Sequence, residues 1–267
     1  MTATTHTLRV PGARLHYEVR GSGPLLLLFG SPMGAAPFTP LAEALAGDHT
    51  VVTHDPRGIS RSVLDDPEQD STPDLRADDV AALLDHLGAD TADLFGSSGG
   101  AVTGLAVAAR HPGRVRTVVA HEPPVLELLP DAAERRAVTD DIIETFRREG
   151  HGPAWAKFMT AAGFDVEAAG PPQGEFSEQD LADSARFFTH ELRGTTRYVP
   201  DVAALRSCPG RVVVGIGAES GGLVTYRTST ALADLLGSAP VEFPGEHGGF
   251  MSHAEAFAET LRKALAG

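Results

Sequence analysis

The sequence predicts an α/β protein with a mostly parallel, doubly wound sheet that carries helices on both faces. Short apolar segments alternate along the chain with longer segments whose apolar residues recur at helical spacing. Residues 24–29 (PLLLLF) are apolar throughout, which is typical of a strand that is covered on both faces. The alternation stops between residues 124 and 200, where only helical patterns occur. We therefore expect one α/β domain with a helical insert.

Each expected element rests on a local pattern. Apolar runs or period-two alternation predict strands at residues 13–20, 24–29, 50–54, 93–96, 116–121, 211–216 and 240–243. Helical spacing predicts helices at residues 38–46, 74–87, 99–111, 131–149, 177–192 and 223–236, and a last helix after Ser252. These boundaries assign residues 1–123 and 201–267 to the α/β domain and residues 124–200 to the insert.

Composition limits the classes of partner. The 267 residues carry a formal net charge of −14, which repels phosphate backbones, so we expect no nucleic-acid partner. Cys208 is the single cysteine, which excludes an intramolecular disulfide and a cysteine-based zinc site. Neither a secretory signal nor an apolar run long enough for a membrane span is visible. We expect a cytoplasmic protein that binds a small molecule, and a homodimer is compatible with the sequence.

A candidate nucleophile lies at residues 96–100 (GSSGG), which fit the G-x-S-x-G pattern of a nucleophile elbow with Ser98 at its centre. An apolar segment precedes the motif and a helical pattern follows it, as an elbow between a strand and a helix requires. Glycines on both sides leave room for a sharp, strained turn. The alternative is an ordinary glycine-rich loop.

A serine nucleophile needs a base and an oxyanion hole. Among eleven histidines, His247 is the best candidate base, because it lies in a glycine-rich loop just after the last expected strand. Gly99, directly after Ser98, and Ser31, in the loop after residues 24–29, are the expected oxyanion donors. Met33, in the same loop, is expected to line the pocket. Alternatively, His247 is only an exposed loop histidine, the loop that holds Ser31 is a plain turn, and Met33 packs in the core.

The insert is rich in aromatic residues. It holds half of the chain's Phe, Trp and Tyr residues, namely Phe146, Trp155, Phe158, Phe164, Phe176, Phe187, Phe188 and Tyr198. Some of these must pack the insert onto the main domain. Together they indicate an apolar or ring-bearing substrate, and Trp155 and Phe188 are the expected contacts.

These motifs resemble those of the α/β-hydrolase fold superfamily. Residues 29–34 stand where that family often has His-Gly-x-x-x-Gly, with Phe29 in place of the His, and residues 55–62 resemble its loop after the fourth strand. More narrowly, the chain is similar to zearalenone-hydrolysing lactonases at residues 60–62, 96–100, 121–124 and 244–247, and at Ser252-His253. The resemblance implies the α/β-hydrolase fold, a helical cap inserted after the sixth strand, and a hydrolase that needs neither a cofactor nor a metal.

The resemblance leaves two candidates for the acid of a catalytic triad. The family usually carries it at the end of a G-x-x-D turn after the strand expected at 211–216, but here residues 217–220 read GAES, so that Glu219 is one residue out of place. Glu122 directly follows the strand expected at 116–121, and the similar lactonases carry their acid in the corresponding His-Glu-x-Pro. We predict Glu122. In the alternative, Glu219 is the acid and Glu122 only binds a backbone amide.

The leading hypothesis is a serine hydrolase that cleaves a carboxylic ester or lactone with Ser98, His247 and Glu122. Thioester or carbon–carbon bond hydrolysis on the same residues stays open, as does a non-catalytic ligand-binding protein of this fold. A further alternative is dinucleotide binding at residues 215–220 (GIGAES), which partly match the glycine fingerprint.

Overall fold

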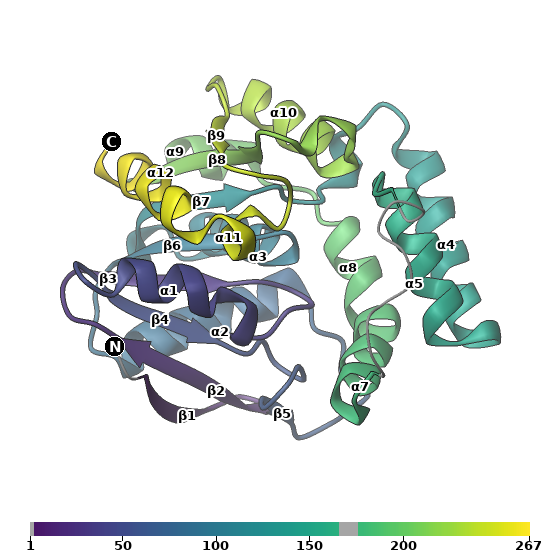
Figure 1. Cartoon of the computed structure of the whole chain (residues 1–267), viewed down its shortest axis with the longest axis horizontal. Coiled ribbons are helices and arrows are strands. Elements are labelled where there is room, and N and C mark those ends of the chain that lie inside the picture. The colour runs from purple at the N-terminus through teal and green to yellow at the C-terminus, as the bar shows by residue number, and fades with distance from the viewer. Residues whose placement is uncertain (1–2, 166–175) are drawn as a thin grey trace.

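The sheet is antiparallel at one edge and parallel over the rest (Figure 1). In the computed structural model, which describes residues 3–165 and 176–267, the strands are β1 (Thr4–Val10), β2 (Ala13–Arg20), β3 (Leu25–Phe29), β4 (Thr50–His54), β5 (Val63–Leu64), β6 (Ala92–Ser97), β7 (Val115–His121), β8 (Arg211–Gly217) and β9 (Val241–Phe243). Their order is β1-β2-β4-β3-β6-β7-β8-β9, and β5 pairs with β2. β1, β2 and β4 pair antiparallel, whereas β4, β3, β6, β7, β8 and β9 run parallel. The predicted mostly parallel sheet is confirmed.

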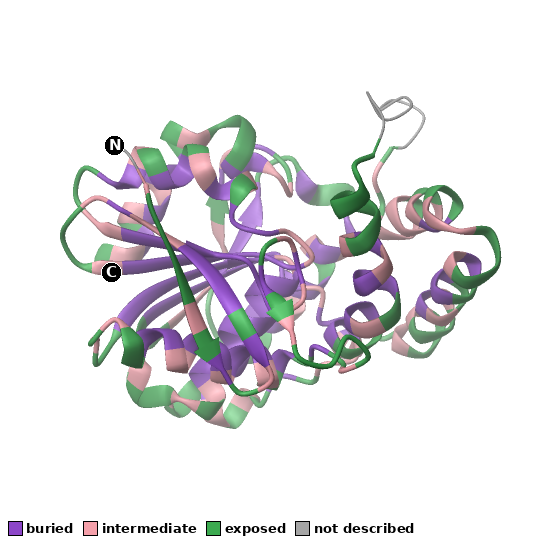
Figure 2. Ribbon diagram, turned by 90° about the horizontal axis from the view of Figure 1, so that it is seen from below, coloured by how far each residue is buried: buried purple, intermediate pink, exposed green. Residues whose placement is uncertain are grey.

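Helices cover both faces of this sheet, as Figure 2 shows by the buried strands between them. One face carries α1 (Thr39–Leu45), α11 (Gly249–Ser252) and α12 (Ala254–Ala266). The other carries α2 (Pro73–His86), α3 (Gly99–Arg110), α9 (Val202–Ser207) and α10 (Val224–Leu236). Short 3₁₀ turns lie at Ala36–Phe38, Pro112–Arg114, Leu126–Leu128 and Ser220–Gly222.

The alternation of side chains along each strand divides the core into two. Leu27 and Phe29 of β3 join the apolar cluster under α2 and α3, whereas Leu26 and Leu28 join the cluster under α1 and α12. Successive residues of a strand point to opposite faces, so a strand with helices on both sides must be apolar at every position. This explains why residues 24–29 lack the alternation seen in β2.

The described part of the segment between β7 and α9 consists of helices and connecting loops and contains no strand. It contains α4 (Ala132–Glu149), α5 (His151–Ala162), α7 (Glu178–Arg186), a π-helical turn (Phe187–Glu191) and α8 (Leu192–Thr196), which Figure 1 shows beside the ends of the parallel strands. Its own small apolar cluster comprises Ile142, Ile143, Ala154, Phe187, Phe188 and Leu192. We refer to residues 124–200 as the helical insert.

Several elements differ from the sequence-based expectations. β1 and β5 were not predicted, because β1 is an exposed edge strand and β5 has two residues. The insert therefore follows the seventh strand along the chain, not the sixth. The helix expected at 177–192 is interrupted by the π-helical turn, and α5 was also missed. No described helix is long and apolar enough to cross a membrane.

Phe95 should be a major contributor to the stability of this core. It is fully buried on β6, and its ring packs against the rings of Phe38, Phe243, Phe250 and Phe257. We expect Phe95→Ala to lower the free energy of unfolding by about 3–5 kcal/mol in urea titrations. Phe176→Ala, at a ring that is 46% exposed, is the matched control and should cost less than about 1 kcal/mol. Equal losses in the two variants would contradict the role assigned to Phe95.

Candidate active site

Ser98 lies in the sharp turn between β6 and α3. Its backbone has φ 58° and ψ −124°, a strained combination for a residue with a side chain. The turn is held by a hydrogen bond of 3.0 Å from the Ser98 N–H to the carbonyl of His121. A Cβ atom on Gly96 would lie 2.4 Å from the Gly100 oxygen, and one on Gly100 would lie 2.4 Å from the Phe29 oxygen. Glycine is therefore required at both positions for the backbone to pack this closely, which an ordinary loop would not require.

Glu122 and His247 form a hydrogen-bonded pair. Glu122 follows β7 directly, has a positive φ of 52° and is fully buried. Its Oε2 lies 2.5 Å from Nδ1 of His247, in the loop between β9 and α11. The same carboxylate accepts hydrogen bonds of 2.8 Å from the Gly217 N–H at Oε1 and from the Thr225 hydroxyl at Oε2. These donors fix the carboxylate against the histidine.

The surroundings of Glu122 keep it ionised. Burial alone would raise the pKa of its carboxyl, but the hydrogen bond and the charge of His247 outweigh burial and bring the pKa to about 2. Because a carboxylate only accepts hydrogen bonds, Nδ1 of His247 carries the proton of this bond, so that Nε2 is the nitrogen with the lone pair whenever the ring is neutral. The neighbouring His121 stays neutral, since complete burial lowers its pKa to about 3.

Glu219 lies away from this pair. It is exposed, and its backbone N–H donates to the carbonyl of Gly245. The N–H groups of Gly217 and Ala218 donate to Glu122 and to the carbonyl of Phe243. The amides of residues 217–219, which a dinucleotide phosphate would need, are therefore already used. Among the described residues, no group of three or more His, Cys, Asp or Glu side chains could hold a metal ion.

The loop after β3 lies against Gly99, the residue that follows Ser98. Gly99 is the first residue of α3, so its N–H has no acceptor within the helix. It lies against the loop after β3, because a Cβ atom on Gly99 would be 2.9 Å from the Ser31 oxygen. Asp55 fixes that loop by accepting a hydrogen bond of 2.7 Å from the Ala35 N–H. The similarity at residues 55–62 thus includes an anchor of this loop.

A buried ion pair holds the side chain of Ser31. The Ser31 hydroxyl donates to Oε2 of Glu191 and accepts from Nη1 of Arg76, both at 2.8 Å. Arg76 also bonds Glu191 directly at 3.2 Å and donates to the Thr195 hydroxyl at 2.8 Å. Burial raises the pKa of the Glu191 carboxyl, and the positive charge of Arg76 opposes that shift. The pair connects the loop after β3 to the helical insert.

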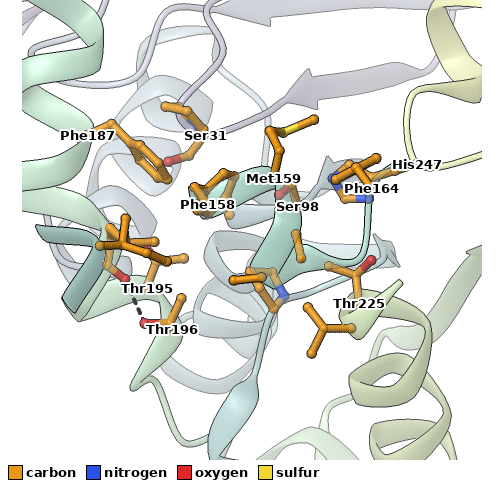
Figure 3. Close-up of a pocket in the computed structure, with 18 of the residues that line it drawn as sticks. Ser31, Ser98, Phe158, Met159, Phe164, Phe187, Thr195, Thr196, Thr225 and His247 are labelled. Carbon is orange, nitrogen blue, oxygen red and sulfur yellow. Dashed lines mark hydrogen bonds between the residues drawn. The ribbon is translucent and has the colours of Figure 1, made fainter. Parts of the chain in front are cut away.

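These elements enclose an apolar cavity of about 440 Å³, shown in Figure 3, a volume within the usual range of small-molecule sites. Of the residues expected in the site, Ser31, Met33, Ser98, Gly99, Trp155 and His247 line it. Glu122 lies behind His247. Further aromatic walls come from Phe158, Phe164 and Phe187. In Figure 3, Ser98 lies between His247 on one side and Ser31, Phe187 and Thr195 on the other.

Phe188 is not where the sequence placed it. It is fully buried in the core of the insert and is not among the residues that line the cavity. Its ring stacks on Phe146 at 5.1 Å, whereas the preceding Phe187 lines the cavity and stacks on Trp155 at 5.5 Å. The aromatic content of the insert does not distinguish two adjacent rings, and the π-helical turn changes the angular phase of the helix that decides which of them faces the cavity.

Sequence motifs gave no signal for Thr225, Arg76, Glu191 or Thr195. Thr225 lies in the first turn of α10, and only the fold brings it to Glu122. The other three belong to the ion-pair network. An arginine and a glutamate inside helical patterns are normally assigned to solvent-facing positions, and no local feature marks these two as buried.

Comparison with known proteins agrees with this geometry. A family model described as "alpha/beta hydrolase fold" matches residues 23–193. The chain belongs to the α/β-hydrolase fold family. It is 36% identical to the uncharacterized hydrolase YraK of Bacillus subtilis, over 99% of this chain and 97% of that protein. It is 30% identical to a zearalenone hydrolase of Cladophialophora bantiana, over 95% of each.

A solved structure has the same fold. It is a thermophilic esterase from Thermogutta terrifontis, which is 20% identical with a TM-score of 0.76 and covers 100% of this chain and 98% of that one. The expected fold, the similarity to zearalenone hydrolase and the expectation of an enzyme are confirmed. This α/β-hydrolase family member is a hydrolase.

The depressed pKa of Glu122 predicts how stability depends on pH. A carboxyl whose pKa falls from 4.5 to about 2 on folding stabilises the folded state above pH 4.5, and this contribution is lost as the pH falls toward 2. We expect the difference in unfolding free energy between wild type and Glu122→Gln to shrink by roughly 3 kcal/mol across that range.

Urea titrations at several pH values would measure this difference wherever both proteins fold. Glu219→Gln, at an exposed carboxylate, is the matched control and should change by less than about 1 kcal/mol over the same range. A Glu122→Gln difference that stays constant between pH 5 and pH 3 would contradict the depressed pKa assigned to Glu122.

Proposed function

We propose that the protein is a serine hydrolase that cleaves a carboxylic ester or lactone of an apolar, ring-bearing substrate without a cofactor. The observation that carries the proposal is the pairing of His247 with a buried, ionised Glu122, in the same cavity as Ser98 on its strained turn. A nucleophile, a base and a group that orients the base are the requirements of a catalytic triad.

In the first half of the reaction, Nε2 of His247 takes the proton of Ser98 as the hydroxyl oxygen attacks the substrate carbonyl. The N–H groups of Ser31 and Gly99 bind the oxyanion of the tetrahedral intermediate. Glu122 stabilises the imidazolium that forms and keeps its ring oriented. His247 then gives the proton to the leaving alcohol oxygen as the bond between carbonyl carbon and alcohol oxygen breaks, which leaves an acyl group on Ser98.

In the second half, His247 takes a proton from water, and the hydroxide oxygen attacks the acyl carbon. The bond to Ser98 breaks, its oxygen regains the proton from His247, and the carboxylic acid leaves. With a lactone, the alcohol and acid groups stay in one product molecule. No external oxidant, reductant or group donor enters this sequence.

The cavity supports an apolar substrate. Trp155, Phe158, Phe164 and Phe187 supply aromatic walls, and Met33 adds an adaptable side chain beside Ser31. A relative that is 30% identical over 95% of both chains is named a zearalenone hydrolase, which agrees with a ring-bearing ligand. Rates on a panel of aryl esters and macrolactones would define the acyl and alcohol groups.

Thioester and carbon–carbon bond hydrolysis use the same residues, so the panel should include an aryl thioester and a vinylogous diketone. We expect the oxygen esters to be cleaved fastest. Faster cleavage of either alternative would reassign the reaction while leaving the triad in place. Binding without turnover of any class would favour a non-catalytic protein.

Ser98→Ala should lower kcat/KM on an aryl acetate by at least about 10³-fold, because only the oxyanion donors and substrate binding remain. A fluorophosphonate probe should label wild type at Ser98 and leave the variant unlabelled, as mass spectrometry would show. Ser97→Ala is the matched control. Ser97 is fully buried on β6, outside the cavity lining, so its variant should keep activity within about tenfold. Wild-type turnover in Ser98→Ala would refute the proposal.

Glu122→Gln should lower kcat by at least about 10²-fold, because the amide can no longer stabilise the imidazolium and disturbs the tautomer of His247. Glu219→Gln should cost less than about tenfold, since its carboxylate is exposed and outside the pair. Steady-state kinetics on folded variants would check this ranking. The reverse ranking would move the acid to Glu219.

A further inference from the structure

One wall of the cavity carries a hydroxyl that has a proton but no acceptor for it. Thr195 of α8 lines the cavity and is 4% exposed. Its Oγ1 accepts a hydrogen bond of 2.8 Å from Nη2 of Arg76. An arginine only donates, so this bond uses a lone pair of the hydroxyl and leaves its proton free. Within residues 3–165 and 176–267, no acceptor for that proton is found.

Other helical threonines of this protein behave differently. Seven of them donate to the carbonyl four residues earlier, namely Thr103, Thr145, Thr160, Thr189, Thr196, Thr230 and Thr260. The corresponding carbonyl for Thr195 belongs to Glu191, at the end of the π-helical turn, where φ is −126° and the helical geometry is broken. Arg76 and this break together turn the Thr195 hydroxyl away from its own helix.

A second unpaired hydroxyl lies on the neighbouring helix. Thr139 of α4 also lines the cavity, is 4% exposed, and has no hydrogen-bond partner in the described parts of the chain. α4 and α8 lie side by side, because Asp140 pairs with Arg193 at 2.9 Å and with Arg197 at 2.7 Å. A buried hydroxyl proton without an acceptor costs free energy, so a ligand atom or water must accept from both hydroxyls when the site is filled.

The charges behind this wall favour a neutral ligand group. The positive charge of Arg76 is balanced by Glu191 at 3.2 Å. Arg135, the cation among the cavity residues, pairs through Nε with Asp131 at 2.9 Å, and Asp131 also pairs with Arg227 at 2.8 Å. The guanidinium next to Thr195, that of Arg76, is therefore not left to bind a carboxylate. In Figure 3, Thr195 and His247 lie on opposite sides of Ser98, so the hydroxyl is remote from the base.

We propose that Thr195, together with Thr139, forms a hydrogen-bonding subsite for a neutral acceptor oxygen, such as a ketone or ether, in the part of the substrate remote from the scissile carbonyl. This inference rests on the proposed hydrolase site, because it assigns the same cavity to the substrate. It names Thr195 as a specificity-determining residue and makes the substrate apolar with one polar position, not a plain hydrocarbon ester.

The test measures binding and so does not depend on turnover. In a Ser98→Ala background, calorimetry compares the para-nitroanilide of heptanoic acid with analogues that carry a ketone at successive positions along the chain. We expect at least one keto analogue to bind about tenfold more tightly than the plain anilide, as one additional hydrogen bond provides. Adding Thr195→Val should reduce this preference to less than about threefold, and Thr139→Val should lower it partially.

Two further variants separate this role from a structural one. Thr195→Ser keeps the hydroxyl and the bond to Arg76, so it should keep the preference. Thr196→Val removes a cavity-lining hydroxyl that already donates to Leu192, so it should also keep the preference. Thermal unfolding would verify that all variants fold.

The subsite is overturned if no keto analogue binds more tightly than the plain anilide, or if Thr196→Val loses the preference as Thr195→Val does. Failure of the proposed function has a different signature, namely ester hydrolysis that survives Ser98→Ala. The calorimetric result decides the subsite in either case.

Discussion

The rest of the site depends on the hydrogen bonds that the buried Glu122 carboxylate accepts. A fully buried carboxylate is costly unless hydrogen bonds satisfy its oxygens. Here the donors come from Gly217 at the end of β8, Thr225 on α10 and His247 after β9. Charge-assisted bonds of this kind are strong, and they offset the cost of burial. One buried group thereby fixes three segments and holds His247 at the cavity wall.

The parallel sheet explains why these segments meet. β3, β6, β7 and β8 are consecutive in the sheet, so the loops at their carboxyl ends share one edge. Ser31, Ser98 and Glu122 each follow one of these strands directly or within two residues. The elbow also belongs to this order, because the Ser98 N–H binds the His121 carbonyl at the end of the neighbouring strand. Strand pairing therefore brings the proposed nucleophile, Ser98, and the proposed acid, Glu122, to the same edge of the sheet.

The sequence predicted the features that a short segment of the chain specifies by itself. Apolar runs located the buried strands, the glycine motif located Ser98, and the end of β7 located Glu122. Contacts between distant segments left no local pattern. Ser31 and Glu191 are 160 residues apart, and Arg76 and Thr195 are 119 apart. Phe188 was predicted in place of Phe187 for a related reason, since one π-helical turn rotates neighbouring side chains and composition does not reveal it.

The buried Arg76–Glu191 ion pair determines which hydroxyl of the cavity wall can donate a hydrogen bond. Replacing such a pair by apolar residues of similar volume is often neutral or stabilising, so stability does not explain its presence. Its partners are two hydroxyls of the cavity wall, from the loop after β3 and from α8. The Ser31 hydroxyl donates to Glu191 and accepts from Arg76, whereas the Thr195 hydroxyl only accepts from Arg76. The ion pair thus occupies the Ser31 hydroxyl fully and leaves the Thr195 hydroxyl able to donate. In the proposed subsite, Thr195 can therefore select a ligand acceptor, whereas the Ser31 side chain cannot.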